Sequence, residues 1–301
     1  YNKDFIDKYL LSLEKEINLY YKNDLLNTLY IGGGTPSCLD EISLKKLFKI
    51  ISIFKLNKTY EFTFECNIED INEKLLIFLK ENKVNRISIG LQSFNKKYIE
   101  FMNRKYLNKK EITDKINLVK KYFNNINIDL IYGINNETLK ELQEEVDSFI
   151  NLDVNHISLY SLILEDNTIL KTKKYKEIDD DLNRKMYDYI RKTLKKNNYI
   201  HYEISNFSKK GYMSKHNLCY WNNDNYYGFG LGSSGFIENI RYTNTRSLNS
   251  YINGNYRYYE EKIDNKRNME HEMILNLRKI KGISKKNFYK KKKRFYSLGT
   301  K

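Results

Sequence analysis

A glycine triplet followed by a hydroxyl and a proline is the first stretch of this sequence that could do chemistry. Gly32-Gly33-Gly34-Thr35-Pro36 follows residues 28–31, whose β-branched and aromatic side chains predict a buried strand. Glycines leave backbone N–H groups open and allow positive φ, so a charged ligand can approach the main chain closely. A strand that ends in such a loop often holds a ligand in α/β proteins, although an ordinary strand-to-helix turn has the same residues.

Polar side chains stand at or just after the carboxyl ends of the next predicted strands, except that Asp129 lies inside its strand, and in a parallel sheet these ends meet at one edge. They are, in chain order, Glu65, Asn67, Gln92, Ser93, Arg104, Asp129, Tyr160, Ser161 and Glu165. Acids, an amide and a cation together suit a zwitterionic ligand with hydroxyl groups: the acids bind an amine or ribose hydroxyls, and Arg104 binds a carboxylate. Taken alone, Asp129 is equally well explained as a core acid with satisfied hydrogen bonds.

Short apolar strands and longer amphipathic helices alternate through the first two thirds of the chain, which places it in the α/β class. Strands are predicted over 28–31, 60–66, 86–91, 126–131 and 156–160, and helices over 5–21, 43–54 with Ser43 as N-cap, 70–81, 95–102, 110–123, 137–150 and 180–197. This order predicts right-handed crossovers and a parallel sheet. Restoring a strand before the first helix gives six βα units, hence a βα barrel, partial or full, with a doubly wound open sheet as the alternative.

The pattern changes near residue 200, and we predict a domain boundary there. Residues 1–200 form the barrel, without its first strand, and residues 201–301 form an incomplete C-terminal extension. A strand at 201–204, a long functional loop at 205–235 and a helix at 268–280 are predicted for the extension. Because the sequence begins with Tyr1 rather than Met, inside a predicted helix, we expect it to be a fragment whose beginning is missing.

Charge and cysteine usage limit the classes of function. The net charge is +15 and the pI about 9.3, but the basic residues are spread along the chain, which indicates compositional drift more than a nucleic-acid partner. The exception is a basic run at 285–294. Three distant cysteines, Cys38, Cys66 and Cys219, indicate a reducing, cytoplasmic compartment and form no local iron–sulfur motif. No apolar run is long enough to span a bilayer.

Four motifs occur in order along the barrel region: IGGGTPS at 31–37, RISIGLQSF at 86–94, DLIYG at 129–133 and HISLYSL at 156–162. Together they resemble the radical S-adenosylmethionine proteins related to oxygen-independent coproporphyrinogen III oxidase. The resemblance implies a partial (βα)6 radical-SAM-type barrel with a C-terminal α/β extension. It also implies that S-adenosylmethionine binds on a 4Fe–4S cluster and contacts Gly33, Gly34, Thr35, Glu65, Gln92, Arg104, Asp129 and, at the adenine, Ile163.

Three later motifs resemble the heme-chaperone branch of that group, HemW: YEISNF at 202–207, HNLCYW at 216–221 and GFGLG at 228–232. The H-N-x-x-Y-W element distinguishes this branch from the oxidase. The resemblance implies that His216 contacts heme, with Tyr220 and Trp221 as aromatic walls. Imidazole is a common axial ligand of heme iron, and flat aromatic rings suit a porphyrin face. The alternative for His216 is a loop histidine that caps local backbone.

The sequence also departs from the family pattern. The three-cysteine cluster motif of the family lies ahead of the first helix, and none of the three cysteines matches it, so we expect no metal site in this chain and look for the cluster ligands upstream of Tyr1. Cys66 and Ile68 stand where the family usually has a small residue and a proline. Ser233 and Ser234 stand where it often has Ala and His.

Two main functions follow from the resemblance. The first is a heme chaperone that delivers heme to an acceptor protein, and the second is an enzyme, the coproporphyrinogen III oxidase of porphyrin biosynthesis. A basic nucleic-acid-binding protein is the weaker third alternative, and we expect no nucleic-acid partner. The resemblance leaves open a homodimer and peripheral contact with membrane hemoproteins.

Overall fold

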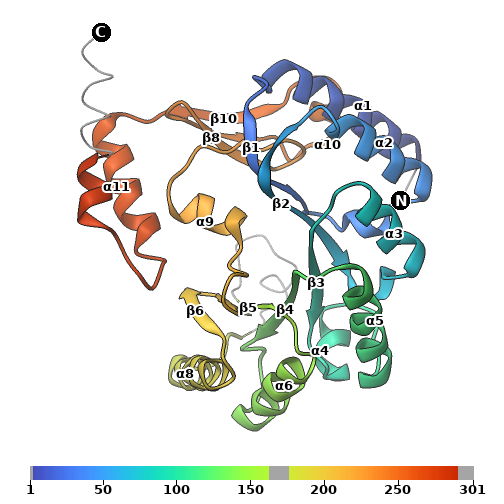
Figure 1. Ribbon diagram of the computed structural model, residues 1–301, viewed down its shortest axis with the longest axis vertical. Helices are drawn as coiled ribbons and strands as arrows, with labels where there is room; N and C mark the ends of the chain where they lie inside the picture. Colours follow the sequence, from blue (N-terminus) through green and yellow to red (C-terminus); the bar gives the residue numbers. More distant parts are fainter. Residues whose placement is uncertain (1–2, 163–175, 291–301) are drawn as a thin grey trace. The chain divides into compact units, whose positions relative to one another are not determined.

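The computed structural model describes residues 3–162 and 176–290 of the chain (Figure 1). The strands of the main sheet are β1 (Leu25–Ile31), β2 (Lys55–Asn67), β3 (Arg86–Gln92), β4 (Ile126–Tyr132), β5 (His156–Ser161), β6 (Ile200–Glu203) and β7 (Asn206–Ser208). The helices between them are α1 (Lys3–Tyr20), α2 (Glu41–Ile51), α3 (Glu73–Glu81), α4 (Lys96–Phe101), α5 (Lys109–Tyr122), α6 (Leu139–Asn151) and α8 (Asp180–Lys196). The predicted alternation of strand and helix is confirmed.

The main sheet has the order β1-β2-β3-β4-β5-β7-β6. Strands β2, β3, β4 and β5 pair in parallel, as a curled half-barrel requires. β7 pairs antiparallel with both β5 and β6, so it separates two strands that run in the same direction. The registers place Glu65 opposite Ser88, Gly90 opposite Asp129, and Asp129 opposite Ser158.

Side chains of the parallel strands alternate between two faces of different chemistry. The apolar face carries residues that are fully buried, including Phe64, Ile87, Ile89, Ile128 and Ile157. Helices α3, α5 and α6 lie along one side of these strands (Figure 1), and their apolar stripes are what such a face buries. The other face is polar and carries Thr63, Glu65, Ser88, Asn127, Asp129, His156 and Ser158. The interior of the half-barrel is therefore hydrophilic.

Three local predictions are wrong. The N-cap of α2 is Asp40, not Ser43, because the Asp40 carboxylate accepts a hydrogen bond from the backbone N–H of Ser43. β2 begins at Lys55, before the predicted start at residue 60. The predicted loop at 205–235 contains β7 and the short helix α9 (Lys215–Trp221), which Ser214 caps. A three-residue strand is defined by its pairing with distant strands, so no local pattern could reveal it.

The chain forms two compact units, each assembled from distant segments. Unit 1 comprises residues 1–29, 39–60 and 214–301, and unit 2 comprises residues 30–38 and 61–213. Strands β1 and β2 contribute residues to both. The division into functional domains at residue 200 stays a prediction. None of the described helices is both long and apolar enough to cross a membrane.

Unit 1 contains a second sheet and two further helices. β8 (Ser234–Ile237), β9 (Ile240–Asn244) and β10 (Arg257–Lys262) form an antiparallel sheet in the order β10-β9-β8. The helices are α10 (Leu248–Ile252) and α11 (Asn265–Asn276). The predicted helix at 268–280 corresponds to α11, which begins and ends earlier.

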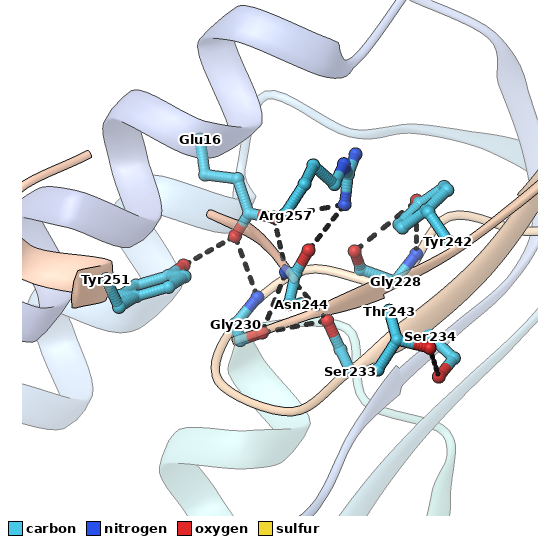
Figure 2. A network of polar contacts seen from close by, with 10 residues as sticks. All are labelled: Glu16, Gly228, Gly230, Ser233, Ser234, Tyr242, Thr243, Asn244, Tyr251 and Arg257. Carbon is cyan, nitrogen blue, oxygen red and sulfur yellow. Dashed lines mark hydrogen bonds and ion pairs between the residues drawn. The ribbon is translucent and has the colours of Figure 1, made fainter. Parts of the chain in front are cut away.

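A buried carboxylate joins helix α1 to this C-terminal part of the chain (Figure 2). Glu16 has no exposed surface and accepts hydrogen bonds from the backbone N–H of Gly230 at 2.8 Å, Asn244 Nδ2 at 2.6 Å and the Tyr251 hydroxyl at 2.5 Å. The guanidinium of Arg257 lies 3.7 Å from the Glu16 carboxylate. Arg257 also stacks over the ring of Tyr242, with 3.4 Å from its Cζ to the ring centroid. The first helix of the sequence therefore belongs to a unit completed by the last third of the chain.

Candidate functional site

The glycine loop after β1 has an unusual backbone and open space on one side. Gly33, Gly34 and Thr35 have φ values of 75°, 73° and 78°, so three successive residues adopt the left-handed conformation. This conformation suits the two glycines and strains Thr35, which carries a Cβ. A Cβ added to Gly33 or Gly34 would meet nothing within 4 Å. The loop therefore presents bare main chain to an open region, as a close ligand contact requires.

Glu65 lies beside this loop at the end of β2. Its carboxylate accepts a hydrogen bond from the Gly33 N–H at 2.9 Å and another from the Tyr30 hydroxyl at 2.5 Å. A Cβ on Gly32 would lie 2.5 Å from the Glu65 carboxyl carbon and 2.6 Å from the Tyr30 ring, so these side chains would have to shift to admit it. Burial and the negative charges of Glu65 and Asp129 raise the pKa of the Tyr30 phenol well above its usual value, which keeps this hydroxyl a hydrogen-bond donor.

Gln92 and Arg104 lie together at the end of β3. A bulge between Gly90 and Gln92 interrupts the pairing of β3 with β4, and Gln92 has a φ of 70°. The side-chain Oε1 of Gln92 is buried and has no hydrogen-bond partner. Arg104 donates to the Gly90 carbonyl at 3.0 Å and to Asn67 Oδ1 at 3.1 Å. These acceptors are neutral, so the positive charge of Arg104 is not balanced by a carboxylate within the described residues.

Asp129 occupies the interior face of β4. Burial raises the pKa of its carboxyl from 3.8 to about 6, although a hydrogen bond from Asn127 opposes this shift and the charge of Glu65 adds to it. Glu65 is therefore close enough for its charge to affect the ionisation of Asp129.

Asn127 fixes the orientation of Asp129, and sequence reasoning missed it. Its amide nitrogen donates to Asp129 Oδ1 and to the Ser88 hydroxyl, both at 2.8 Å. Its amide oxygen accepts from Ser158 at 3.0 Å and from Nδ1 of His156 at 2.5 Å. All four hydrogen-bonding positions of this amide are therefore filled. The period-two alternation places Asn127 on the same face of β4 as Asp129, but it does not reveal the partners on the neighbouring strands.

The imidazole of His156 extends the same network. It is fully buried, and burial followed by the charge of Arg86 lowers its pKa well below the usual value. A neutral ring donates from one nitrogen only. Because Nδ1 meets the Asn127 oxygen, Nε2 accepts from the Tyr202 hydroxyl at 2.7 Å. A hydrogen-bonded chain thus runs from Tyr202 through His156 and Asn127 to Asp129.

Unit 2 therefore brings together most of the residues that the sequence singled out for a cofactor. Hydrogen bonds, strand register and mutual electrostatic effects connect the glycine loop, Glu65, Gln92, Arg104 and Asp129. Ile163 and Glu165 lie outside the described residues. Residues 291–294 of the basic run do as well.

His216, predicted as the heme contact, lies on α9 in unit 1. Its Nδ1 is 2.9 Å from the Thr28 hydroxyl and its Nε2 is 2.7 Å from the hydroxyl of Tyr220, one turn later on the helix. Both of these contacts are to side chains, and the role of His216 in heme binding stays a prediction. The ring centroids of His216 and Tyr220 are 4.9 Å apart, and those of Tyr220 and Trp221 are 6.5 Å apart.

The cysteines do not assemble a metal site in the described part of the chain. No group of three or more His, Cys, Asp or Glu residues is arranged there to hold a metal ion. Cys38 is exposed, Cys66 is buried and Cys219 is partly exposed. Burial raises the pKa of the Cys66 thiol, which disfavours the thiolate that binds metals.

Comparisons with known proteins agree with the fold and the motifs. The model of the radical SAM superfamily matches residues 3–149. The heme chaperone HemW of Lactococcus lactis is 38% identical over 95% of this chain and 77% of its own length, and that of Bacillus subtilis is 36% identical over 97% and 82%. The solved structure of coproporphyrinogen III oxidase (HemN) from Escherichia coli superposes with a TM-score of 0.84 over 97% of this chain and 73% of that one.

The last comparison, at 19% identity, shows the fold alone. The sequence relatives show more, because they are 38% and 36% identical over 95% and 97% of this chain. The chain belongs to the HemW family within the radical SAM superfamily.

Proposed function

We propose that this chain binds heme at His216 and delivers it to an acceptor protein. The relatives of this family carry the name heme chaperone, and the observation that supports the proposal is the side-chain setting of His216. Thr28 orients the imidazole through Nδ1, so Nε2 is the nitrogen suited to bind the heme iron. The Tyr220 hydroxyl, which contacts Nε2, must then move aside to become part of the heme surroundings.

The chain's place in the radical SAM superfamily implies S-adenosylmethionine and a 4Fe–4S cluster as cofactors. We infer that the residues gathered in unit 2 hold the S-adenosylmethionine. The glycine loop and Glu65 suit its amine, Arg104 its carboxylate and Asp129 its ribose hydroxyls. The unpartnered Oε1 of Gln92 fits this assignment, because a buried acceptor is costly unless a ligand donates to it. The part assigned to Ile163 stays a prediction.

The cluster itself does not fit the described residues. The three cysteines match no cluster motif, and no metal-binding group is formed in the described part of the chain. The ligands of a cluster are therefore not assigned to Cys38, Cys66 or Cys219. The function proposed here needs no step at the cluster, since it concerns the binding and release of heme.

Titration with hemin tests the proposal directly. Wild-type protein is expected to shift the Soret band with a stoichiometry near one, and His216→Ala is expected to weaken binding by about 10-fold or more, because an axial ligand is lost. His201→Ala is the matched control: His201 stacks on Phe207 and lies outside the proposed site. Absence of a Soret shift at stoichiometric hemin would contradict heme binding. Equal losses in both variants would contradict the role of His216.

The oxidase alternative is not favoured. Its support is a shared fold at 19% identity, whereas the relatives at 36% to 38% identity are named heme chaperones. We keep the heme-acceptor protein as the proposed partner. A homodimer, peripheral contact with membrane hemoproteins and a cytoplasmic location stay predictions.

A further inference from the structure

Unit 1 contains a pocket of about 320 Å³ that includes two of the predicted heme contacts. Tyr220 and Trp221 form part of its wall, together with Tyr226 and Arg241. The rings of Tyr220 and Tyr226 meet edge to face, with centroids 4.6 Å apart. The pocket therefore combines aromatic walls, which suit a flat ligand, with a guanidinium.

Neutral groups hold Arg241 in place. It donates from Nη2 to Asn223 Oδ1 at 2.7 Å and from Nε to His271 Nδ1 at 3.2 Å. Its guanidinium lies over the ring of Phe236, 4.4 Å from the centroid. Burial, followed by the charge of Arg241, lowers the pKa of His271, so that this imidazole stays neutral. No carboxylate within the described residues forms an ion pair with Arg241.

A second guanidinium lies next to the same wall. Arg278 stacks on Trp221, with 4.4 Å from its Cζ to the ring centroid. Its Nε and the indole Nε1 of Trp221 are both buried, and neither has a hydrogen-bond partner in the structure. Arg278 likewise forms no ion pair with a described carboxylate. Arginine without a carboxylate partner, positioned beside an aromatic pocket, is the usual arrangement for recognising an anion.

We propose that this pocket recognises the carboxylate groups of a planar aromatic ligand, with Arg241 as the residue that binds them and Arg278 in support. The inference rests on the proposed function, under which the ligand is heme and the groups are its two propionates. Tyr220 connects the two halves of the site, since it lines the pocket and contacts Nε2 of His216. In this arrangement Arg241 would form ion pairs with the propionates at one edge of the heme. His216 would bind the heme iron.

The test compares hemin with hemin dimethyl ester, which has the same ring and iron but no free carboxylates. Wild-type protein is expected to bind hemin about 10-fold more tightly than the ester, the size of one good charge-assisted hydrogen bond. Arg241→Gln should remove most of this preference by weakening hemin binding alone. Arg267→Gln is the matched control, because Arg267 lies on α11 and is already paired with Glu261. It should keep the full preference.

Several outcomes would overturn the inference. Equal affinity of the wild type for hemin and ester would exclude carboxylate recognition, and so would an Arg241→Gln variant that loses both ligands equally while retaining wild-type thermal stability. If Arg241→Gln fails to fold, Arg278→Gln gives a second reading: a reduced preference for hemin over the ester supports the inference, and a full wild-type preference contradicts it. The proposed function is judged separately by His216→Ala: it survives if this variant loses both ligands, whatever Arg241 does.

Discussion

The carboxyl of Asp129 shows how a single residue in this interior is prepared for a ligand. Burial away from water raises the pKa of this carboxyl to about 6. A hydrogen bond from the Asn127 amide holds it in one orientation. Without a ligand, ionising this buried carboxyl costs more free energy than ionising an exposed one. A group that donates hydrogen bonds to it, such as a ribose hydroxyl, would relieve that cost.

The raised pKa predicts a defined pH dependence of stability. Between about pH 4 and pH 6 the folded protein binds a proton at Asp129 that the unfolded chain does not, so this carboxyl favours folding at low pH and the benefit is lost as the pH rises through about 6. Asp129→Asn, which cannot ionise, should therefore gain stability relative to the wild type by roughly 2–3 kcal/mol between pH 4 and pH 7. Urea unfolding of both proteins at several pH values measures this difference. A difference that does not change with pH would refute the burial of this carboxyl.

The sequence predicted the polar residues of the candidate cofactor site, but not the residues whose hydrogen bonds orient them. Glu65, Gln92 and Asp129 stood out because polar groups followed apolar strands. Asn127 and His156 did not, because each precedes an apolar residue inside a strand and reads as ordinary alternation. Their importance comes from register: Asn127 stands opposite His156 on the neighbouring strand, and local sequence does not determine that pairing.

In the glycine loop, adjacent positions differ in the space that is available to a side chain. Gly32→Ala would place its Cβ 2.5 Å from the Glu65 carboxyl and 2.6 Å from the Tyr30 ring, which must separate these two side chains. Gly33→Ala has free space and suffers only the strain of a positive φ, about 1 kcal/mol. We expect Gly32→Ala to lose roughly 2–4 kcal/mol of unfolding free energy, as overpacking does. Thermal melts of the two variants compare them, and equal losses would contradict this steric account.

Helix α1 depends on a contact far away in the sequence. Glu16→Ala would leave Arg257 without its carboxylate and remove the acceptor for Gly230, Asn244 and Tyr251 (Figure 2). Breaking a buried ion pair from one side costs about 3–5 kcal/mol. Denaturant unfolding should show this loss for Glu16→Ala and almost none for Glu14→Ala, an exposed acid on the same helix. Comparable stability of the two variants would show that the buried network contributes little.

The elements that the sequence predicted well are those with a long amphipathic or apolar pattern. The parallel strands β3, β4 and β5 and the helices α5, α6 and α8 begin and end within a few residues of their predicted limits. β7 and α9 were missed inside a stretch rich in Asn, Ser, Gly and Tyr. Both depend on tertiary partners: β7 on its pairing with β5 and β6, and α9 on the contact of His216 with Thr28.

Segments that are far apart in the sequence pack together in the same unit. Unit 1 takes its first helix from the beginning of the chain and its second sheet from the end. The contacts of Glu16 with Asn244 and of Thr28 with His216 close these loops of more than 180 residues. Closing such long loops costs conformational entropy, which the packing of all segments of unit 1 must offset. We therefore expect unit 1 to unfold in a single cooperative transition.

A fragment that stops at residue 213 tests this expectation. It would keep α1 but lack Gly230, Asn244 and Tyr251, so the buried Glu16 would have none of these three partners. We expect its segment 3–20 to exchange amide hydrogens much faster than the same segment in residues 1–301, since α1 would keep its packing on α2 but lose α10 and the partners of its buried carboxylate. Mass spectrometry of deuterium uptake compares the two. Strong protection of this segment in the fragment would mean that α1 is stabilised without the C-terminal part of unit 1, and the buried carboxylate would then have to be explained by function instead of by assembly.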